Sequence, residues 1–363
     1  MVKCLTVLLT ILIHNTCLAI NVTFINPSVP GTAFWDRVSA AAVAAADDFD
    51  IQLTILYGRD NRIFQYKAIE QAIAAEITPD YIIFMPYDGN AVQSYDLIEA
   101  AKIPFVTIER TLQPTEQAEL GQPQQKYHYW LGEIFHNNVN AGKLLADALI
   151  EQAVKGANKK SLTAIGIAGS FSGESNQRAE GLKQSIDAHH NIELLQVVPA
   201  IWSRERSRHI ILQLTERFGD IDIAWAASDS MALGVLDSLK SGYDKMNPKL
   251  AIGGIDWTVE AIQAVKQGDL AASVGGHIMQ TAWALVKIYD HHRGIKVFTK
   301  GKNSESYDLE VIHNKNIMHY FILANKVNWR AVNFKQFTRS YTKQDHYQFS
   351  FRLIIEALNN NSD

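Results

Sequence analysis

The feature that most constrains the fold is an alternation of strand-like and helix-like segments that runs through the chain twice. From Asn21 onward, short apolar runs alternate with stretches of helical periodicity, and after a loop rich in Gln and Pro at residues 112–126 the same rhythm restarts near Thr163. A strand, a helix and another strand in succession favour a parallel sheet, because the crossover helix returns the chain to the same edge. The sequence therefore predicts an α/β protein with two Rossmann-like lobes, each built on a parallel doubly wound sheet.

The individual elements follow from the same periodicities. In the first half we expect strands at residues 22–26, 52–56, 81–85 and 105–108 and helices at 33–48, 62–75 and 91–101. In the second half we expect strands at 163–168 and 193–198, helices at 177–188 and 204–218, and two further strands before Asp229 and Asp256. A chain of 363 residues is too long for one ordinary core and suits two lobes of about 150 residues each.

The amino terminus has the pattern of a secretory signal peptide. Lys3 precedes an apolar run at residues 5–13, and Cys17-Leu-Ala19 supplies small residues at both positions that a signal peptidase reads. We therefore expect residues 1–19 to be removed after Ala19 and the mature protein to reach the periplasm. An apolar first strand is one alternative. Lipid attachment at Cys17 is another, although His-Asn-Thr is a poor approach to a lipidated cysteine.

Charge and cysteine content exclude several classes of site and partner. Cys4 and Cys17 both lie in the expected signal, so a mature chain of 344 residues (363 minus 19) has no thiol for a disulfide or a cysteine-metal site. The formal net charge is −4, and the sequence has no basic stripe or helix-turn-helix pattern, so we expect no nucleic-acid partner. After the signal, no apolar run reaches the ~20 residues that a membrane-spanning helix needs.

A polar ligand site is expected where two strands of the second half end. Residues 223–229 read Ile-Ala-Trp-Ala-Ala-Ser-Asp, and residues 252–257 read Ile-Gly-Gly-Ile-Asp-Trp. Each run ends in a small residue and an aspartate, Asp229 or Asp256, before the spacing becomes helical. Because the carboxyl ends of parallel strands meet at one edge of a sheet, these side chains should lie close together beside a crevice.

These two segments resemble, in wording and spacing, the sugar-binding branch of the type I periplasmic binding protein superfamily, which includes ribose- and galactose-type receptors and autoinducer receptors. The resemblance implies two lobes that close on one small ligand. It also implies three crossings of the chain, near residues 132–137, 275–277 and 308–312, with hinge residues Asn137, Gly275 and Gly276. The implied boundaries are 20–133 plus 277–308 for the first lobe, 134–276 plus 309–325 for the second, and 326–363 for an extension packed on the lobes.

The resemblance also assigns ligand contacts in the first lobe. Phe34 and Trp35 match paired aromatic residues that sandwich a sugar, and Glu109-Arg110 stands where the family has Asp-Arg. Aromatic faces pack on the carbon–hydrogen side of a sugar ring, while a carboxylate or a guanidinium can bind two neighbouring hydroxyls. Core packing is the alternative for each aromatic residue, and a rim ion pair is the alternative for Glu109-Arg110.

In the second lobe the implied contacts are Asn176, Trp202, Ser228, Asp229, Asp256 and Trp257. Asn176 falls where the family has its ligand arginine, whereas Arg178 matches a second arginine that is often structural, so which of the two contacts the ligand stays open. Ser228 replaces an asparagine, and Gly276 replaces a hinge glutamine. The loss of these three polar groups argues against ribose and favours a different polyol, pentose, hexose or sugar-like signal.

The sequence offers little support for catalysis, a metal or a cofactor. Residues 169–173 lack the spacing of a nucleophile elbow because their centre is phenylalanine, and there is no phosphate-binding loop or HExxH motif. The paired histidines at 189–190 and 291–292 lie at expected helix ends, where the helix dipole explains them better than a metal does. Glu109 and Asp256 could pass for a glycosidase pair, but the resemblance implies a binding protein.

We therefore expect a monomeric periplasmic receptor, without a cofactor, that captures a small sugar or sugar-like ligand. It would present the ligand to the membrane permease of an ATP-driven (ABC) importer. The alternative is signalling to a membrane sensor kinase or similar receptor, and the sequence does not separate the two because the discriminating information lies in the partner. The aromatic-rich stretch from Lys326 is expected to be a structural strap, with docking to a membrane partner as the alternative.

Overall fold

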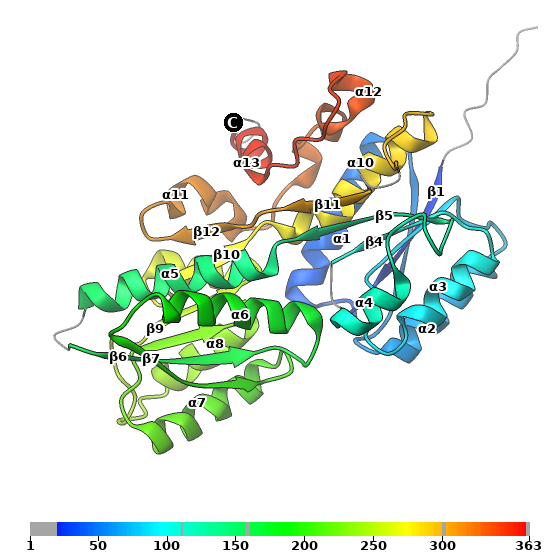
Figure 1. The fold of residues 1–363 in the computed structure, drawn as a ribbon. Helices are drawn as coiled ribbons and strands as arrows, with labels where there is room; N and C mark the ends of the chain where they lie inside the picture. The colour runs from blue at the N-terminus through cyan, green and yellow to red at the C-terminus, as the bar shows by residue number, and fades with distance from the viewer. Residues whose placement is uncertain (1–19, 110–111, 157–159, 300–302, 361–363) are drawn as a thin grey trace, which may run out of the picture.

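Two six-stranded sheets organise the part of the chain that this computed structural model describes, which is residues 20–109, 112–156, 160–299 and 303–360. The first sheet has the order β11-β5-β4-β3-β1-β2, and the second has the order β12-β10-β9-β8-β6-β7. All neighbouring strands are parallel except β10 and β12, which are antiparallel. Figure 1 shows the two lobes side by side. The predicted fold class is confirmed.

The first lobe contains β1 (Asn21–Asn26), α1 (Ala33–Asp48), β2 (Gln52–Tyr57), α2 (Arg62–Ile73), β3 (Tyr81–Phe84), α3 (Ala91–Ala100), β4 (Phe105–Ile108), α4 (Pro114–Leu120), β5 (Trp130–His136), α10 (Gln280–His292) and β11 (Ser304–Tyr307). The second contains α5 (Asn138–Gly156), β6 (Leu162–Ala168), α6 (Gly173–Asp187), β7 (Ile192–Pro199), α7 (Arg204–Phe218), β8 (Ile223–Ala226), α8 (Asp229–Lys240), β9 (Ala251–Ile255), α9 (Val259–Gln267), β10 (Ala272–Gly275) and β12 (Glu310–His313). A short 3-10 turn, η1 (His277–Met279), connects β10 to α10.

The central strands are largely apolar because helices cover both faces of each sheet. β3 reads Tyr-Ile-Ile-Phe and β4 reads Phe-Val-Thr-Ile, and every residue of both strands is buried. α1 turns Val38 and a row of alanines toward the core, so this helix can lie close to its neighbours. With both faces covered, the open positions of the sheets are the loops at the carboxyl ends of their strands, where ligands bind in such folds.

The chain passes between the lobes three times: after His136, after Gly275, and between Tyr307 and Glu310. These passages fall within the three expected ranges. The expected boundary after residue 133, however, cuts through β5. That strand pairs with β4 and with β11 as far as His136, so the boundary moves to the end of the strand.

Backbone geometry at the crossings brings two of them together. The N–H of Asn137 donates to the carbonyl of Tyr307 at 3.1 Å, so the first and third passages lie side by side. The Asn137 side chain accepts from the N–H of Asn140 at 3.0 Å and thereby caps α5. Gly276 has φ +123°, a conformation that side-chain-bearing residues rarely adopt.

Beyond the second lobe, the chain forms an extension that packs on α1 and α10 of the first lobe. Asp290 on α10 accepts three hydrogen bonds from it, from the backbone N–H groups of Arg339 and Ser340 and from the Tyr347 hydroxyl. Phe334 is fully buried in this contact. The extension ends in α12 (Arg339–Thr342) and α13 (Phe351–Asn360), which lie along one edge of the molecule in Figure 1.

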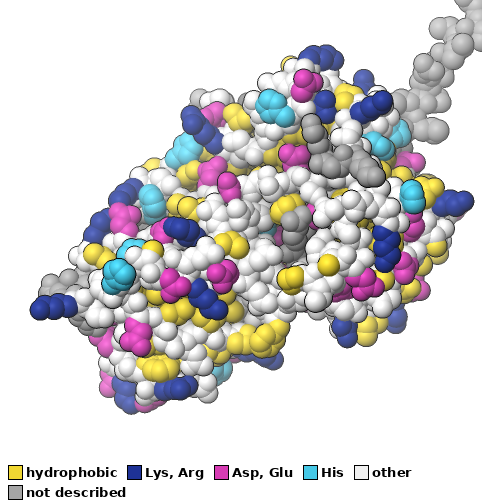
Figure 2. Space-filling view, in the orientation of Figure 1, with side chains coloured by type: hydrophobic (Ala, Val, Ile, Leu, Met, Phe, Trp, Pro, Cys, Tyr) yellow, Lys and Arg dark blue, Asp and Glu magenta, His cyan; other side chains and the backbone are white. Residues whose placement is uncertain are grey.

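The described helices include none that is both long enough and apolar enough to cross a bilayer. On the face shown in Figure 2, basic and acidic side chains are interspersed rather than gathered by sign.

Candidate functional site

A cavity of about 720 Å³ lies between the two lobes, at the carboxyl ends of their strands. The first lobe contributes Phe34 and Trp35 from the start of α1 and Glu109 from the end of β4. The second contributes Ser228, Trp202, Asp256 and Arg178. Both lobes therefore contribute side chains to the lining of the cavity, and those named here were all considered in the sequence analysis. Arg110, also selected, lies outside the described residues.

The apolar walls of the cavity are aromatic. Phe34 and Trp35 meet edge to face with ring centroids 5.1 Å apart, and Phe34 also lies 4.5 Å from the ring of His277. On the other side, Trp202 donates its indole N–H to the Ser170 hydroxyl at 3.2 Å, which fixes the ring plane. Flat aromatic faces therefore line the cavity from both lobes, and such faces can pack against the apolar side of a ligand.

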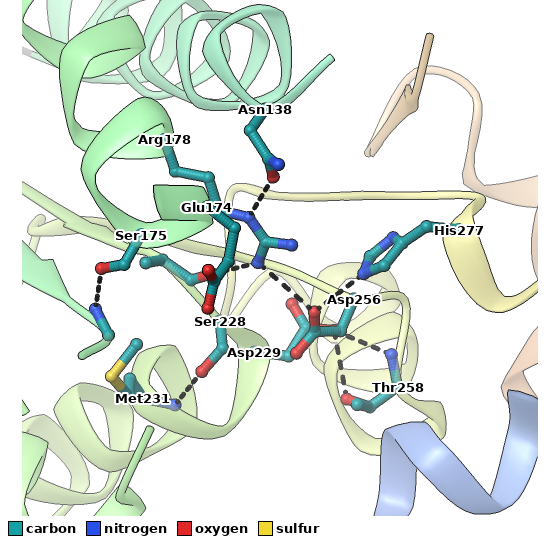
Figure 3. Close-up of polar contacts among 12 residues, drawn as sticks. Asn138, Glu174, Ser175, Arg178, Ser228, Asp229, Met231, Asp256, Thr258 and His277 are labelled. Atoms are coloured by element: carbon teal, nitrogen blue, oxygen red, sulfur yellow. Dashed lines mark hydrogen bonds and ion pairs between the residues drawn. The ribbon is translucent and has the colours of Figure 1, made fainter. Parts of the chain in front are cut away.

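Arg178 is the one Lys or Arg side chain lining the cavity among the described residues, and it is 4% exposed. Its Nε donates to Asn138 Oδ1 at 2.9 Å and its Nη1 donates to the carbonyl of Ala227 at 2.8 Å (Figure 3). Nη1 also lies 3.8 Å from Asp256 Oδ1, and Nη2 lies 3.3 Å from His136 Nε2. The guanidinium is therefore held rigidly at the centre of the polar groups.

This placement corrects the assignment of Asn176. Asn176 is exposed and does not line the cavity. Arg178 lines the cavity and also makes the structural hydrogen bonds described above. Two residues apart on a helix, the two side chains point in nearly opposite directions, so only one can face the cleft. Arg178 lies on the face of α6 that packs inward.

Three carboxylates surround this guanidinium. Burial raises the pKa of Glu109 to about 7, although Arg178 opposes the effect. Burial likewise raises the pKa of Glu174 to about 7, while a hydrogen bond from the Ser172 hydroxyl opposes it. The pKa of Asp256 is also raised, again mainly by burial, with Arg178 lowering it. Desolvated carboxylates of this kind are typical of functional sites.

Asp229 has a different position from the one expected. It is fully buried and does not line the cavity. Its Oδ2 accepts from the N–H of Thr258 at 2.8 Å and from the Thr258 hydroxyl, and its Oδ1 accepts from the Ser273 hydroxyl at 2.8 Å. The carboxylate has no remaining face for a ligand, so we reassign Asp229 to holding the loop after β9. Ser228 lines the cavity and caps α8 by accepting from the N–H of Met231.

Trp257 is the third correction. Its side chain is fully buried, and its indole N–H donates to the carbonyl of Ser273 at 3.0 Å. A Cβ on Gly275 would lie 2.4 Å from Trp257 Cγ, so the indole lies flat against the backbone of β10, away from the cavity. Trp257 therefore belongs to the packing behind Asp256 rather than to the cavity wall.

Two buried histidines, His136 and His277, lie against each other at the passages between the lobes with ring centroids 4.6 Å apart, and of the two only His277 lines the cavity. Burial lowers the pKa of both His136 and His277 well below the usual range, so both rings are neutral. One ligand atom from each of Glu109, His136 and His277 lies within 4.8 Å of the others, which is close enough for one metal ion. The Arg178 guanidinium 3.3 Å from His136 opposes a dication there.

Sequence reasoning missed Glu174 and His136. Glu174, Arg178 and Leu182 are spaced by four along α6, so helical periodicity places all three on one face, and the burial of Leu182 shows which face is inside. His136 has no such signal, because its neighbours at the end of β5 do not alternate in polarity.

Comparisons with known proteins find similar sequences and folds among sugar-binding proteins. A ribose import binding protein of Haemophilus influenzae is 27% identical over 271 residues, which cover 74% of this chain and 84% of that protein. A periplasmic sugar-binding protein from Pseudomonas fluorescens has a TM-score of 0.79 at 22% identity, covering 92% of this chain and 99% of that one. An ABC transporter solute-binding protein from Actinobacillus succinogenes, solved with bound D-allose, has a TM-score of 0.70 at 19% identity, covering 83% and 100%.

The profile of the periplasmic binding protein domain family matches residues 22–294, which run from β1 through α10 and include the described residues that line the cavity and all strands of both sheets except β11 and β12. This match spans most of the sequence. The chain therefore belongs to the periplasmic binding protein domain family.

Proposed function

We propose that this protein is a periplasmic receptor that binds a small sugar or polyol between its lobes and delivers it to the permease of an ATP-driven importer. The observation that carries the proposal is the cavity itself, in which aromatic faces from both lobes enclose Arg178 and three desolvated carboxylates. Such groups bind neighbouring hydroxyls through charge-assisted hydrogen bonds, which are strongest where water is excluded.

The proposed contacts are Phe34, Trp35, Glu109, Glu174, Arg178, Trp202, Ser228 and Asp256, with Arg110 added from the family resemblance alone. The sequence analysis counted the family's ligand arginine as lost at Asn176, but Arg178 supplies a guanidinium to the cavity. The serine at 228 and the glycine at 276 still differ from the ribose-type pattern. We therefore propose a pentose, hexose or cyclic polyol other than ribose as the first choice of ligand.

A thermal-shift screen tests this proposal. Purified protein would be heated with D-ribose, D-allose, other pentoses and hexoses, and myo-inositol, each in large excess. A ligand at 100 times its dissociation constant stabilises the folded state by about 2.7 kcal/mol, which is readily measured as a rise in melting temperature. The Asp256→Ala variant is the control and should respond less. If no sugar or polyol raises the melting temperature of the wild type, the proposed ligand class is wrong.

Import is favoured over signalling because the curated relative from Haemophilus influenzae is a ribose import protein and the Actinobacillus succinogenes neighbour is an ABC transporter component. Deleting the gene should abolish uptake of the radiolabelled ligand if the importer role is correct. Normal uptake combined with loss of a transcriptional response to the same sugar would favour a sensor partner instead.

Three further parts of the proposal have direct measurements. Export to the periplasm predicts that the mature protein begins at Ile20, which amino-terminal sequencing would show. A monomer predicts a mass near that of one chain by light scattering. A binding role without catalysis predicts that the recovered sugar is unchanged after incubation, whereas hydrolysis of a glycoside would point to Glu109 and Asp256 as a catalytic pair.

A further inference from the structure

The loop that carries Asp256 has an unfavourable backbone conformation. Asp256 has φ +137° and Trp257 has φ +55°, both in the region that residues with side chains rarely adopt. Such conformations persist only when the surrounding structure fixes them more strongly than the strain opposes them, and they are concentrated at functional sites. The position of the Asp256 carboxylate in the cavity therefore depends on whatever holds residues 256 and 257.

The second lobe holds this loop on one side. The Asp256 N–H donates to the carbonyl of Val274 at 2.7 Å, and the Trp257 indole N–H donates to the carbonyl of Ser273 at 3.0 Å. The indole is seated against Gly275, where even a Cβ would collide with it. Both contacts come from β10, so the indole cannot move further toward that strand.

The carboxy-terminal part of the chain covers the other side of the indole. The ring of Tyr320 lies 5.2 Å from it, and the ring of Phe351 lies 4.9 Å from it in an edge-to-face contact at 76°. Phe351 is the first residue of α13 and is 7% exposed. The extension that leads to Phe351 is fastened to α10 through the three hydrogen bonds of Asp290. The indole is thus enclosed between β10 and a segment anchored on the first lobe.

We propose that Phe351 is a positioning residue for ligand binding: it clamps Trp257 against β10 and thereby holds the strained loop that aims Asp256 into the cavity. The proposal rests on the proposed function, in which Asp256 binds the ligand. It gives the extension a part in recognition, although Phe351 does not line the cavity. Without the Phe351 ring, the indole gains space on the side that faces away from β10, and residues 256–257 can relax toward ordinary backbone angles.

The first test uses ligand-free protein. Hydrogen exchange measured by mass spectrometry on peptides that cover residues 256–258 should be faster in Phe351→Ala than in the wild type, and Phe351→Leu should restore most of the protection. Phe337→Ala is the matched control, because Phe337 is 4% exposed and belongs to the same extension but packs on Trp283. Equal exchange at residues 256–258 in Phe351→Ala and Phe337→Ala overturns the proposal.

The second test measures affinity by calorimetry with D-allose or D-ribose, whichever binds the wild type. Phe351→Ala should weaken binding roughly 2- to 30-fold, the range for mutations that modulate coupling between sites. Phe337→Ala, measured well below its melting temperature, should leave affinity unchanged. If Asp256→Ala weakens binding and Phe351→Ala does not, the positioning role is refuted while the proposed function stands. If Asp256→Ala leaves affinity unchanged, the assignment of Asp256 itself fails, and the positioning role in binding fails with it.

Discussion

Replacing Glu109 with glutamine should make the ligand-free protein more stable while making it a poorer receptor. The pKa of Glu109 is about 7, against an ordinary value of 4.5, because burial removes the carboxylate from water. Its Oε2 lies 3.7 Å from Nδ1 of His136, a ring whose pKa is lowered so far that it carries no compensating charge. A pKa raised by this amount corresponds to a destabilisation of about 3 kcal/mol when the group is ionised.

The sign of the effect follows from proton binding. Below about pH 4.5, Glu109 is protonated in both the folded and the unfolded chain, so it does not make the free energy of unfolding depend on pH. Between pH 4.5 and 7 the unfolded chain ionises first, so the free energy of unfolding decreases as the pH rises. Above pH 7 both states are ionised and the full penalty of about 3 kcal/mol is present. Glutamine keeps the shape without the charge and escapes this penalty.

Urea denaturation at pH 5 and pH 8 measures both quantities. Glu109→Gln should exceed the wild type in unfolding free energy by up to about 3 kcal/mol at pH 8 and by much less at pH 5. It should also bind sugar about 1.5–3 kcal/mol more weakly, because a charge-assisted hydrogen bond is lost. Glu70→Gln, on the exposed side of α2, is the matched control and should change neither. A Glu109→Gln variant that is no more stable than the wild type at pH 8 would refute this reasoning.

Three other substitutions test separate parts of the cleft. Trp202→Phe should diminish the change in tryptophan fluorescence on adding ligand, and a spectral response equal to wild type would remove Trp202 from the site. Gly276→Val should weaken ligand binding and reduce the contraction of the protein seen by small-angle scattering at subsaturating ligand, since valine strongly disfavours φ +123°. If affinity and contraction both equal those of the wild type, the hinge lies elsewhere. Gln113 Nε2 donates to the carbonyl of Phe171 at 2.6 Å, a hydrogen bond that connects the two lobes. Gln113→Ala removes this bond and should raise the ligand dissociation rate with little change in the free energy of unfolding; an unchanged rate would contradict a role for this bond in closure.

Strands and helices with a clear hydrophobic periodicity could be predicted from the sequence. Elements that bury polar residues could not, because those residues interrupt the apolar pattern. β4 has the bounds that its apolar run predicts, Phe105–Ile108. β5 was not among the expected strands because it reads Trp-Leu-Gly-Glu-Ile-Phe-His, which breaks the apolar run. Its Glu133 is buried because the hydroxyl of Ser304, a residue 171 positions away, donates to it at 2.7 Å. A partner at that separation has no signal in the local sequence.

The candidate site shows the same division. Phe34, Glu109 and Asp256 line the cavity because strand ends in this fold open onto it, so their place follows from topology. Asp229 also follows a strand, but it accepts hydrogen bonds from Thr258 and Ser273 across the sheet edge and turns away from the cavity. Position at a strand end predicts proximity to the ligand, whereas the direction of the side chain depends on partners that only the three-dimensional structure brings together.

The cavity also concentrates features that reduce stability, and this bears on how a receptor signals that it is loaded. Of the eleven non-glycine residues with positive φ in the described chain, five line the cavity: Asp60, Glu109, Ile201, Trp202 and Asp256. Each such conformation costs on the order of 1–3 kcal/mol, and the desolvated carboxylates add to that cost. Hydroxyl donors from a ligand favour the ionised carboxylates that burial disfavours, so binding offsets this penalty only when the two lobes enclose the ligand together. Under the proposed function, the free energy gained is then specific to the closed form, which is the condition for a ligand to shift the hinge equilibrium and for the proposed membrane partner to distinguish the loaded protein from the empty one.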